Sequence, residues 1–395
     1  MSSSVSAQPF LRNRLTWLAY LMLAYIAVNQ TILGPLMPTL RREMNLNYTF
    51  GGMLPAASAL GLVFSGLVGD WLARYFKRQS LFWGGSVGLV SGVILLSFSH
   101  NFELAIVAAL AMGFGSSLTQ VMIQALLSDE HGEKRAMAFT EANVAASLSA
   151  TVTPVLIGTL QGLHWNWRLI PILPLFLLIL LATFYYRVPV PDNAPLQAGP
   201  TTVPANLPFT FWMYWLVLFL VVAVEMAIAV WATDFLANVA GLGATNAALA
   251  FSAFPAAMLT GRFLGSRLTQ QWSSHVLLLL AIIITMIGFP IFWLARTATL
   301  NIVGLFITGL GIANLYPLTL SIAVGLAAQQ SNQASARASL AVGTALLAIP
   351  LFLGWLADRL GIQNAYSIVI VLAVLALAIV INNRLLLKRT ASPQP

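Results

Sequence analysis

The residues best suited to chemistry in this sequence are a few polar side chains inside long apolar segments. Glu225 lies well inside one such segment, with no basic residue within one helical turn. An ionisable side chain at the centre of a membrane helix costs about 2.5–3.5 kcal/mol, so it indicates a functional site. A carboxyl group in apolar surroundings can hold a proton near neutral pH. We therefore expect Glu225, and secondly Glu141, to carry a proton, the alternative being carboxylates held by a neighbouring helix or by solvent.

Uncharged polar side chains form a second group inside the apolar segments. Gln120 and Gln124 are four residues apart and share one helix face. Amides both donate and accept hydrogen bonds, as binding a hydroxylated solute requires. The alternative is hydrogen bonding between helices, worth about 0.6 kcal/mol on average. The candidate substrate-binding residues are Asn29, Gln30, Gln120, Gln124, Asn143, Trp231, Asn314 and Tyr316.

The composition excludes most soluble classes of protein. Of the 395 residues, 59% are hydrophobic and 8% are charged, whereas soluble proteins carry about 25% charged residues. The net charge of +8 does not indicate nucleic-acid binding, because the basic residues lie singly or in small groups between apolar segments. The absence of cysteine excludes disulfides and thiolate metal sites. We expect no cofactor, no metal site, no catalytic residue and no ATP-driven step, since no phosphate-binding loop is present.

Twelve segments are long and apolar enough to cross a membrane, which needs about 20 residues. Six precede and six follow a proline-rich linker, so the predicted domains are 1–187, the linker 188–208, and 209–395. The spans are expected near 15–39, 48–72, 79–99, 103–128, 136–161, 168–187, 209–236, 244–268, 274–295, 298–327, 335–357 and 363–386. The sequence thus predicts an all-α integral membrane protein.

The lysines and arginines predict the orientation. With the amino terminus in the cytoplasm, 14 of the 19 basic residues fall on the inner side and 5 on the outer side (14 + 5 = 19). Positive residues are enriched in cytoplasmic loops. We therefore expect a multi-pass protein of the plasma (inner) membrane, in contact with membrane lipid, with both termini in the cytoplasm. We expect it to act as a monomer.

The two halves repeat each other at a shift of 196 residues. Gly69 falls on Gly265 (265 − 69 = 196), and Gly113 falls on Gly309 at the same shift. Two six-span halves related by a parallel repeat are one plan of secondary transporters, with the substrate bound between the halves.

A loop motif resembles the major facilitator superfamily. Residues 61–78, GLVFSGLVGDWLARYFKR, place a glycine, an aspartate and basic residues in that family's order. Trp71 and Ala73 depart from the family pattern, which has a basic residue and a glycine after the aspartate. The resemblance implies the major facilitator fold of twelve transmembrane helices. It also implies a cytoplasmic gate, assigned to Gly66, Asp70, Arg74, Arg262 and Arg267.

A narrower resemblance concerns the second half. The residues similar to those of fucose- and glucose-type proton symporters are Glu225, Trp231, Phe254, Gly261, Arg262 and the Asn314-Leu-Tyr316-Pro segment. This resemblance implies a secondary transporter that moves a small organic solute by alternating access. We expect proton symport of a neutral or hydroxylated solute such as a sugar, with another ion as an open alternative to the proton.

Two other functions remain open on the sequence. Pro154 and Gly158 partly retain a span-five pattern associated with antiporters, so a proton-coupled exporter of drugs or metabolites is the first alternative. Many proton-coupled members carry an arginine where this chain has Ala109, which makes arginine-dependent drug exporters a poorer comparison. The second alternative is a membrane sensor or lipid-handling protein that transports nothing.

Overall fold

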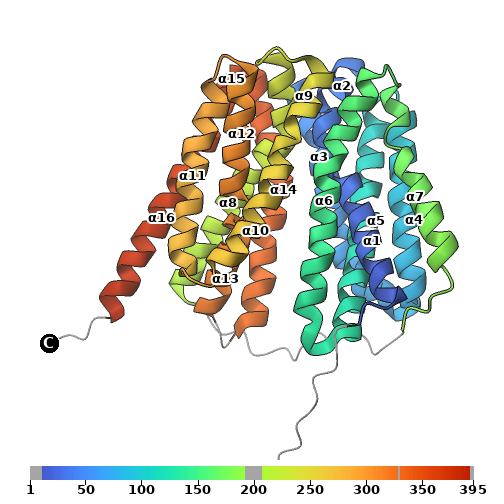
Figure 1. Cartoon of the computed structure of the whole chain (residues 1–395), viewed down its shortest axis with the longest axis horizontal. Helices are drawn as coiled ribbons and strands as arrows, with labels where there is room; N and C mark the ends of the chain where they lie inside the picture. The colour runs from blue at the N-terminus through green and yellow to red at the C-terminus, as the bar shows by residue number, and fades with distance from the viewer. Residues whose placement is uncertain (1–10, 192–206, 328–329, 392–395) are drawn as a thin grey trace, which may run out of the picture.

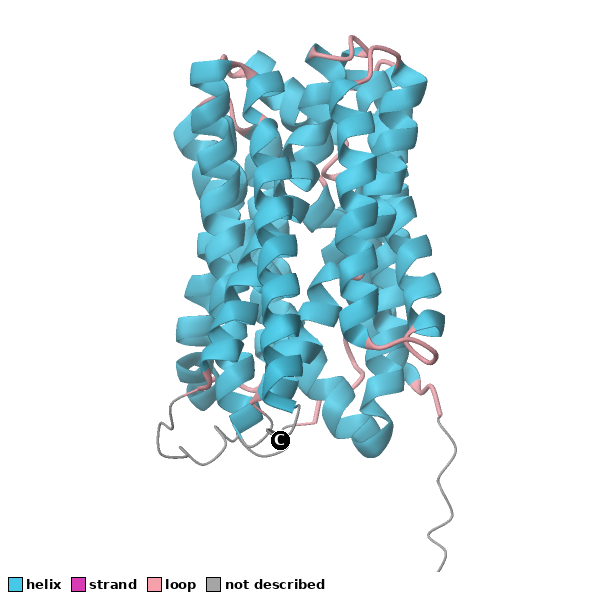
Figure 2. Cartoon of the chain, turned by 90° about the vertical axis from the view of Figure 1, so that its left-hand side faces the viewer, coloured by secondary structure: helices cyan, strands magenta, loops and turns pink. Residues whose placement is uncertain are grey.

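The computed structural model describes residues 11–191, 207–327 and 330–391, and this part of the chain is helical without a strand. It contains 12 helical segments long and apolar enough to cross a membrane. Figure 2 shows them packed side by side along one direction. The predicted fold class is therefore confirmed. Residues 192–206 of the expected linker lie outside the described residues, between α7 and α8.

The helices of the two halves have the following bounds. The first half contains α1 (Arg14–Thr31), α2 (Leu33–Glu43), α3 (Tyr48–Tyr75), α4 (Arg78–Phe98), α5 (Phe102–His131), η1 (Gly132–Lys134), α6 (Arg135–Gly162), η2 (Trp167–Leu169) and α7 (Leu173–Tyr185). The second half contains α8 (Phe209–Asn238), α9 (Gly243–Phe251), α10 (Ala253–Leu268), α11 (Ser274–Leu294), α12 (Ala298–Ile312), α13 (Leu315–Leu326), α14 (Ser331–Leu360), α15 (Ile362–Ala365) and α16 (Ser367–Ala391). Both the described start of α1 and the end of α16 lie at the lower edge of Figure 1, which we call the terminal face.

Three long spans are interrupted in their interior, in each case three residues before a proline. Proline has no N–H group, so the carbonyl four residues earlier loses its helical hydrogen bond. A membrane helix tolerates such a break where other protein groups or a cavity satisfy the backbone. The breaks fall at Ile32, Ser252 and Asn314, and the prolines that follow are Pro35, Pro255 and Pro317.

Each half has its own apolar core. Buried side chains such as Leu18, Met22 and Phe82 pack together in the first half, and a second cluster contains Phe289 and Tyr366. Two separate cores let each half keep its internal packing while the contacts between the halves change, which alternating access requires.

The halves pack closely toward the face opposite the termini, which we call the opposite face. A Cβ atom on Gly34 of α2 would collide with the carbonyl of Ala229 in α8, and one on Gly52 of α3 would collide with that of Pro350 in α14. Only glycine permits such close approach of two helix backbones. On the terminal side of α3, a Cβ on Gly66 would have no neighbour within 4 Å. Figure 1 shows the two halves diverging toward the terminal face.

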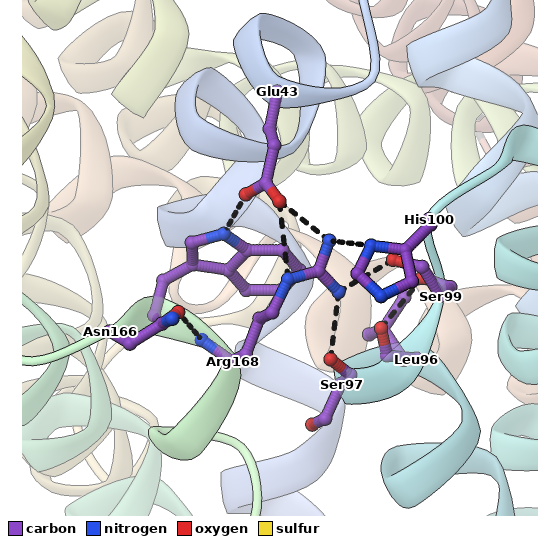
Figure 3. A network of polar contacts seen from close by, with 8 residues as sticks. Glu43, Leu96, Ser97, Ser99, His100, Asn166 and Arg168 are labelled. Atoms are coloured by element: carbon purple, nitrogen blue, oxygen red, sulfur yellow. Dashed lines mark hydrogen bonds and ion pairs between the residues drawn. The ribbon is translucent and has the colours of Figure 1, made fainter.

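A polar network fixes the ends of three elements within the first half (Figure 3). Arg168 of η2 donates to the Glu43 carboxylate at 2.6 Å and to the Ser97 carbonyl at 2.8 Å. The indole N–H of Trp167 also donates to Glu43. Because these residues come from η2 and from the ends of α2 and α4, the network stabilises one half without joining it to the other.

Candidate functional site

A central cavity of about 430 Å³ lies between the two halves. Its walls come from α1, α2, α3, α5 and α6 of the first half and from α8, α9, α10 and α14 of the second. Its polar and charged lining residues include Asn29, Gln30, Ser116, Asn143, Ser147, Glu225 and Arg262. Five of these seven were predicted from the sequence as site or gate residues. The cavity therefore brings polar groups from both halves to one place.

Glu225 reaches the cavity from the middle of α8. Its side chain is half-buried, and the ion pairs found among the described residues do not involve it. The positive charge of Arg262, also in the cavity lining, acts on this carboxyl group. The site thus holds one acid and one base on the same half of the protein.

Asn29 and Gln30 reach the cavity from the end of α1, just before the break at Ile32. The amide of Asn29 donates to the Tyr25 carbonyl at 2.8 Å. Its Oδ1 atom is buried and has no hydrogen-bond partner among the described residues. Because an unpaired buried acceptor is costly, this oxygen is available to a donor group of a solute or to a water molecule.

Two polar residues of α6 face the cavity from the other side of the first half. Asn143 is exposed, and its amide donates to the Phe139 carbonyl at 2.8 Å. The hydroxyl of Ser147 accepts a hydrogen bond of 3.0 Å from the Arg262 guanidinium of α10. This bond links the two halves across the site.

Most of the remaining lining is apolar. The thioether side chains of Met112, Met226 and Met258 and the rings of Phe251 and Phe254 contribute to it. Methionine is flexible and polarisable, so it adapts to apolar groups of different shape. The cavity therefore combines a small charged and polar region with a larger apolar surface, the usual composition of a small-molecule site.

Five predicted substrate-binding residues lie outside this lining. The indole of Trp231 is buried and donates to the Pro350 carbonyl at 3.3 Å. The amide of Asn314 donates to the Gly261 carbonyl at 2.6 Å, which ties the break between α12 and α13 to α10. Gln120 and Gln124 lie on α5 beyond the lining residues, and Tyr316 is 39% exposed. The role of these five as substrate contacts stays a prediction.

Glu141, the second predicted proton carrier, lies on α6 near the terminal face. It forms an ion pair with Arg12 at 2.6 Å and accepts a hydrogen bond of 3.1 Å from the Tyr20 hydroxyl. The Glu141 carboxylate is the main reason why the pKa of Arg12, just before α1, is raised above its usual value. These contacts hold the start of α1 against α6 rather than line the cavity.

The residues assigned to the cytoplasmic gate lie in different surroundings. Gly66 and Arg74 are exposed on α3, and the Arg267 guanidinium lies 4.6 Å from the centre of the Phe263 ring. Arg262 lines the cavity. The side chain of Asp70 lies outside the described residues. The gate stays a prediction about the conformation in which the terminal face closes.

The opposite face holds a polar cluster that was not predicted from the sequence. Arg41 of α2 pairs with Asp234 of α8 at 2.7 Å, and its guanidinium carbon lies 3.3 Å from the centre of the Tyr48 ring. Asp358 of α14 accepts the N–H groups of Tyr48 and Thr49 at 2.7 and 2.8 Å. Both carboxylates belong to the second half and both partners to the first. The sequence indicates only that Arg41 and Asp234 both lie near the ends of spans, not that they pair.

Comparison with known proteins identifies the family. Residues 19–330 match the profile of the Major Facilitator Superfamily. The chain is 21% identical over 319 residues to the cyanate transport protein CynX of Escherichia coli (strain K12), covering 77% of this chain and 80% of that protein. It is 26% identical over 291 residues to the probable nitrate/nitrite antiporter NarK1 of Thermus thermophilus, covering 68% and 65% of the two chains.

The fold resembles solved structures over almost its whole length. A bacterial homolog of the human lysosomal transporter Spinster, in an inward-facing and occupied conformation, superposes with a TM-score of 0.81. The two sequences are 16% identical, and the match covers 98% of this chain and 100% of the other. At this identity the likeness concerns the fold alone.

These comparisons correct the subgroup suggested by the sequence analysis. Two of the relatives found by sequence are named for cyanate and for nitrate and nitrite, and neither is named for fucose or glucose. Among the residues of the earlier resemblance, Glu225, Phe254 and Arg262 line the cavity. Trp231, Gly261, Asn314 and Tyr316 lie outside its lining.

Proposed function

Because this chain belongs to the Major Facilitator Superfamily, we propose that it carries a small organic solute together with a proton through the central cavity. The coarser function follows from the family: the chain is a multi-pass membrane protein and a secondary transporter of small solutes, not an enzyme. Beyond this, we infer that transport is symport with a proton, and we assign residues that bind the proton and residues that bind the solute.

The observation that carries the proposal is the position of Glu225. It is the acidic residue in the lining of the cavity, which it shares with Asn29, Gln30 and Asn143 of the other half. A carboxyl group there can alternate between protonated and ionised forms as the cavity opens to one side and then the other. Solute bound by the amides would then be carried in the same step.

The orientation is part of the proposal. With the terminal face in the cytoplasm, the close packing of Gly34 and Gly52 at the opposite face closes the cavity to the outside. The structure would then represent an inward-facing state. The excess of basic residues on the expected inner side supports this orientation.

Glu141 receives a different role in this proposal. Its ion pair with Arg12 and its hydrogen bond from Tyr20 fix one end of α1. We therefore assign proton coupling to Glu225 and a structural role to Glu141.

The test is to replace Glu225 with Gln in purified protein reconstituted into liposomes. A solute identified by thermal shift is then followed in two ways, as exchange at equal concentrations and as uptake driven by a pH gradient. We expect the variant to keep exchange and to lose accumulation, because glutamine cannot release a proton. Glu103→Gln, which alters an exposed acid in the first turn of α5, is the matched control.

Accumulation by the Glu225→Gln protein at the level of the original chain would refute the proposal. Loss of accumulation in Glu141→Gln, with exchange intact, would move the coupling site to Glu141.

An exporter remains the second candidate. One relative is named a probable nitrate/nitrite antiporter, and Gly158 of the antiporter-like pattern packs against Leu249 of the second half. The direction of solute flux in liposomes of known protein orientation separates symport from antiport. Proton and solute move the same way in symport and opposite ways in antiport.

A further inference from the structure

Arg262 is an exposed arginine of a membrane span that reaches the central cavity. It lies on α10, inside the segment Gly243–Leu268, and it lines the central cavity. Its one described hydrogen bond goes to the uncharged hydroxyl of Ser147. The four ion pairs found among the described residues join other side chains. A guanidinium that stays charged under all physiological conditions therefore faces the cavity, and no carboxylate among the described side chains is bound to it.

A charge in this position needs a partner when the cavity closes around a solute. Burying an unpaired charge is expensive, and buried charges in proteins are paired or hydrogen-bonded. Glu225 is an acid in the same lining, but a protonated Glu225 carries no charge. In the proton-loaded state the solute itself must supply the negative charge that Arg262 lacks.

The rest of the lining indicates what else the solute contains. Met112, Met226, Met258, Phe251 and Phe254 give the cavity a large apolar wall. A volume of about 430 Å³ lies in the range of pockets for organic ligands. A small inorganic anion has no apolar surface to bury against this wall. The carbon skeleton of an organic acid does, and burying it contributes favourable binding free energy.

We propose that the solute is an organic monoanion, a carboxylate with an apolar body, whose carboxylate binds Arg262 while its body lies against the methionine and phenylalanine side chains. This inference names the substrate class for the proton-coupled transport proposed above and rests on that proposal. Arginine binds a carboxylate through two parallel N–H donors, which gives strength and orientation. The bond to Ser147 places this anion site where the two halves meet.

The charges in the cavity balance in both stages of the cycle. Without solute, ionised Glu225 and Arg262 sum to zero. Adding one proton to Glu225 and one monoanion at Arg262 leaves the sum at zero. The cavity therefore carries no net charge during the conformational change, whether it is empty or loaded. A pH difference then drives transport, while a membrane potential does not.

Two other titratable groups interact electrostatically with Glu225 and belong to the same charge balance. They are Arg262 of α10, which also lines the cavity, and Tyr316 of α13, which lies outside the lining. Tyrosine is neutral in the physiological range. The proton on Glu225 and the anion on Arg262 are therefore the two charges expected to change during transport, and each favours binding of the other.

The experiment uses pairs of probes that differ only in charge. Butyrate, benzoate and phenylacetate are each compared with the corresponding amide, and nitrate and cyanate serve as small inorganic anions. Binding is measured by the thermal shift of the purified full-length protein, which needs no transport. Uptake into liposomes is then measured with a pH gradient and, separately, with a potassium diffusion potential.

We expect the carboxylates with apolar bodies to stabilise the protein and their amides to stabilise it at least about tenfold more weakly in apparent Kd. Arg262→Gln should remove that preference, and Arg262→Lys should keep part of it. Arg296→Gln, which changes an exposed arginine between α11 and α12 that lies outside the cavity lining, should behave like the original chain. A melting temperature of the ligand-free variants within a few degrees of the original shows that they are folded.

The proposal is overturned if no carboxylate binds, if amides bind as tightly, if nitrate and cyanate bind more tightly than benzoate, or if Arg262→Gln keeps the carboxylate preference. Failure of the proton-coupled function looks different. Carboxylates would then bind in an Arg262-dependent way, while uptake would ignore the pH gradient and Glu225→Gln would change nothing.

Discussion

Arg41 of α2 and Asp234 of α8 form an ion pair of 2.7 Å that joins the two halves at the opposite face. The side chain of Asp234 is fully buried, and that of Arg41 is 14% exposed. Asn238 donates a second hydrogen bond to Asp234 at 2.9 Å, and the ring of Tyr48 lies against the guanidinium. Opening this face would separate the pair and expose both charges to water. The ion pair therefore stabilises only the conformation in which the opposite face is closed.

We predict that Asp234→Asn favours opening of the opposite face. Breaking a buried ion pair from one side leaves the other charge unpaired and costs about 3–5 kcal/mol, a cost borne by the closed state. The chain has no cysteine, so Ala146→Cys in the cavity lining provides a single thiol. Its reaction with a membrane-impermeant maleimide added to intact cells should become at least about tenfold faster in the Asp234→Asn background.

The control and the counter-result for this prediction use the same thiol. Glu103→Gln, an exposed acid on α5, should leave the labelling rate unchanged. An unchanged rate in Asp234→Asn as well would show that the ion pair does not hold the face closed.

We expect Asp358→Asn also to accelerate labelling of Ala146→Cys from outside, but by less than Asp234→Asn does. Asp358 of α14 accepts the N–H groups of Tyr48 and Thr49, as an N-terminal capping carboxylate does. Loss of such a contact costs about 0.5–2 kcal/mol. Because Tyr48 also contacts Arg41, the double variant Asp358→Asn with Asp234→Asn should accelerate labelling by less than the product of the two single effects. If the acceleration in the double variant equals the product of the two single accelerations, the two contacts act independently.

The sequence predicted the spans well because the membrane imposes a local rule. Each span needs a long apolar run, and Arg14–Glu43 or Phe209–Asn238 is recognisable from its own residues. The breaks at Ile32 and Ser252 were not predicted, although Pro35 and Pro255 were visible. A proline removes one hydrogen bond, but whether the helix bends or separates there depends on what packs against it.

The candidate site was predicted only in part, and helical geometry explains the difference. Periodicity shows that Gln120 and Gln124 share a face, but not which way that face points. The structure leaves both outside the cavity lining while Asn29 and Glu225 belong to it. The pair of Arg41 and Asp234 joins residues 193 positions apart, and no local pattern records a contact of that kind. Arg262 was assigned to a gate because the neighbouring motif suggested it, whereas its position depends on how α10 packs.

The network around Arg168 allows a prediction about stability without a change in conformation. Arg168 binds Glu43 and the carbonyls of Ser97 and Ser99, all within the first half. Arg168→Gln should lower the free energy of unfolding by about 2 kcal/mol, since the arginine is largely buried and Glu43 is partly exposed. We expect a lower melting temperature and an unchanged labelling rate at Ala146→Cys. A changed rate at an unchanged melting temperature would contradict this assignment.

Glycines at the two faces should shift the conformational balance in opposite directions. A Cβ on Gly34 would collide with the Ala229 carbonyl, so Gly34→Ala penalises the closed opposite face and should accelerate labelling of Ala146→Cys from outside.

Gly66→Ala adds a methyl group where nothing lies within 4 Å in this structure. It should therefore be harmless here and disfavour only the state in which the terminal face closes around the predicted gate, so that external labelling slows. Gly325→Ala, also without a neighbour within 4 Å, is the control that should leave the rate unchanged. Acceleration by Gly66→Ala would mean that this glycine does not take part in closing the terminal face, and the gate assignment would fail while the role of Gly34 remained.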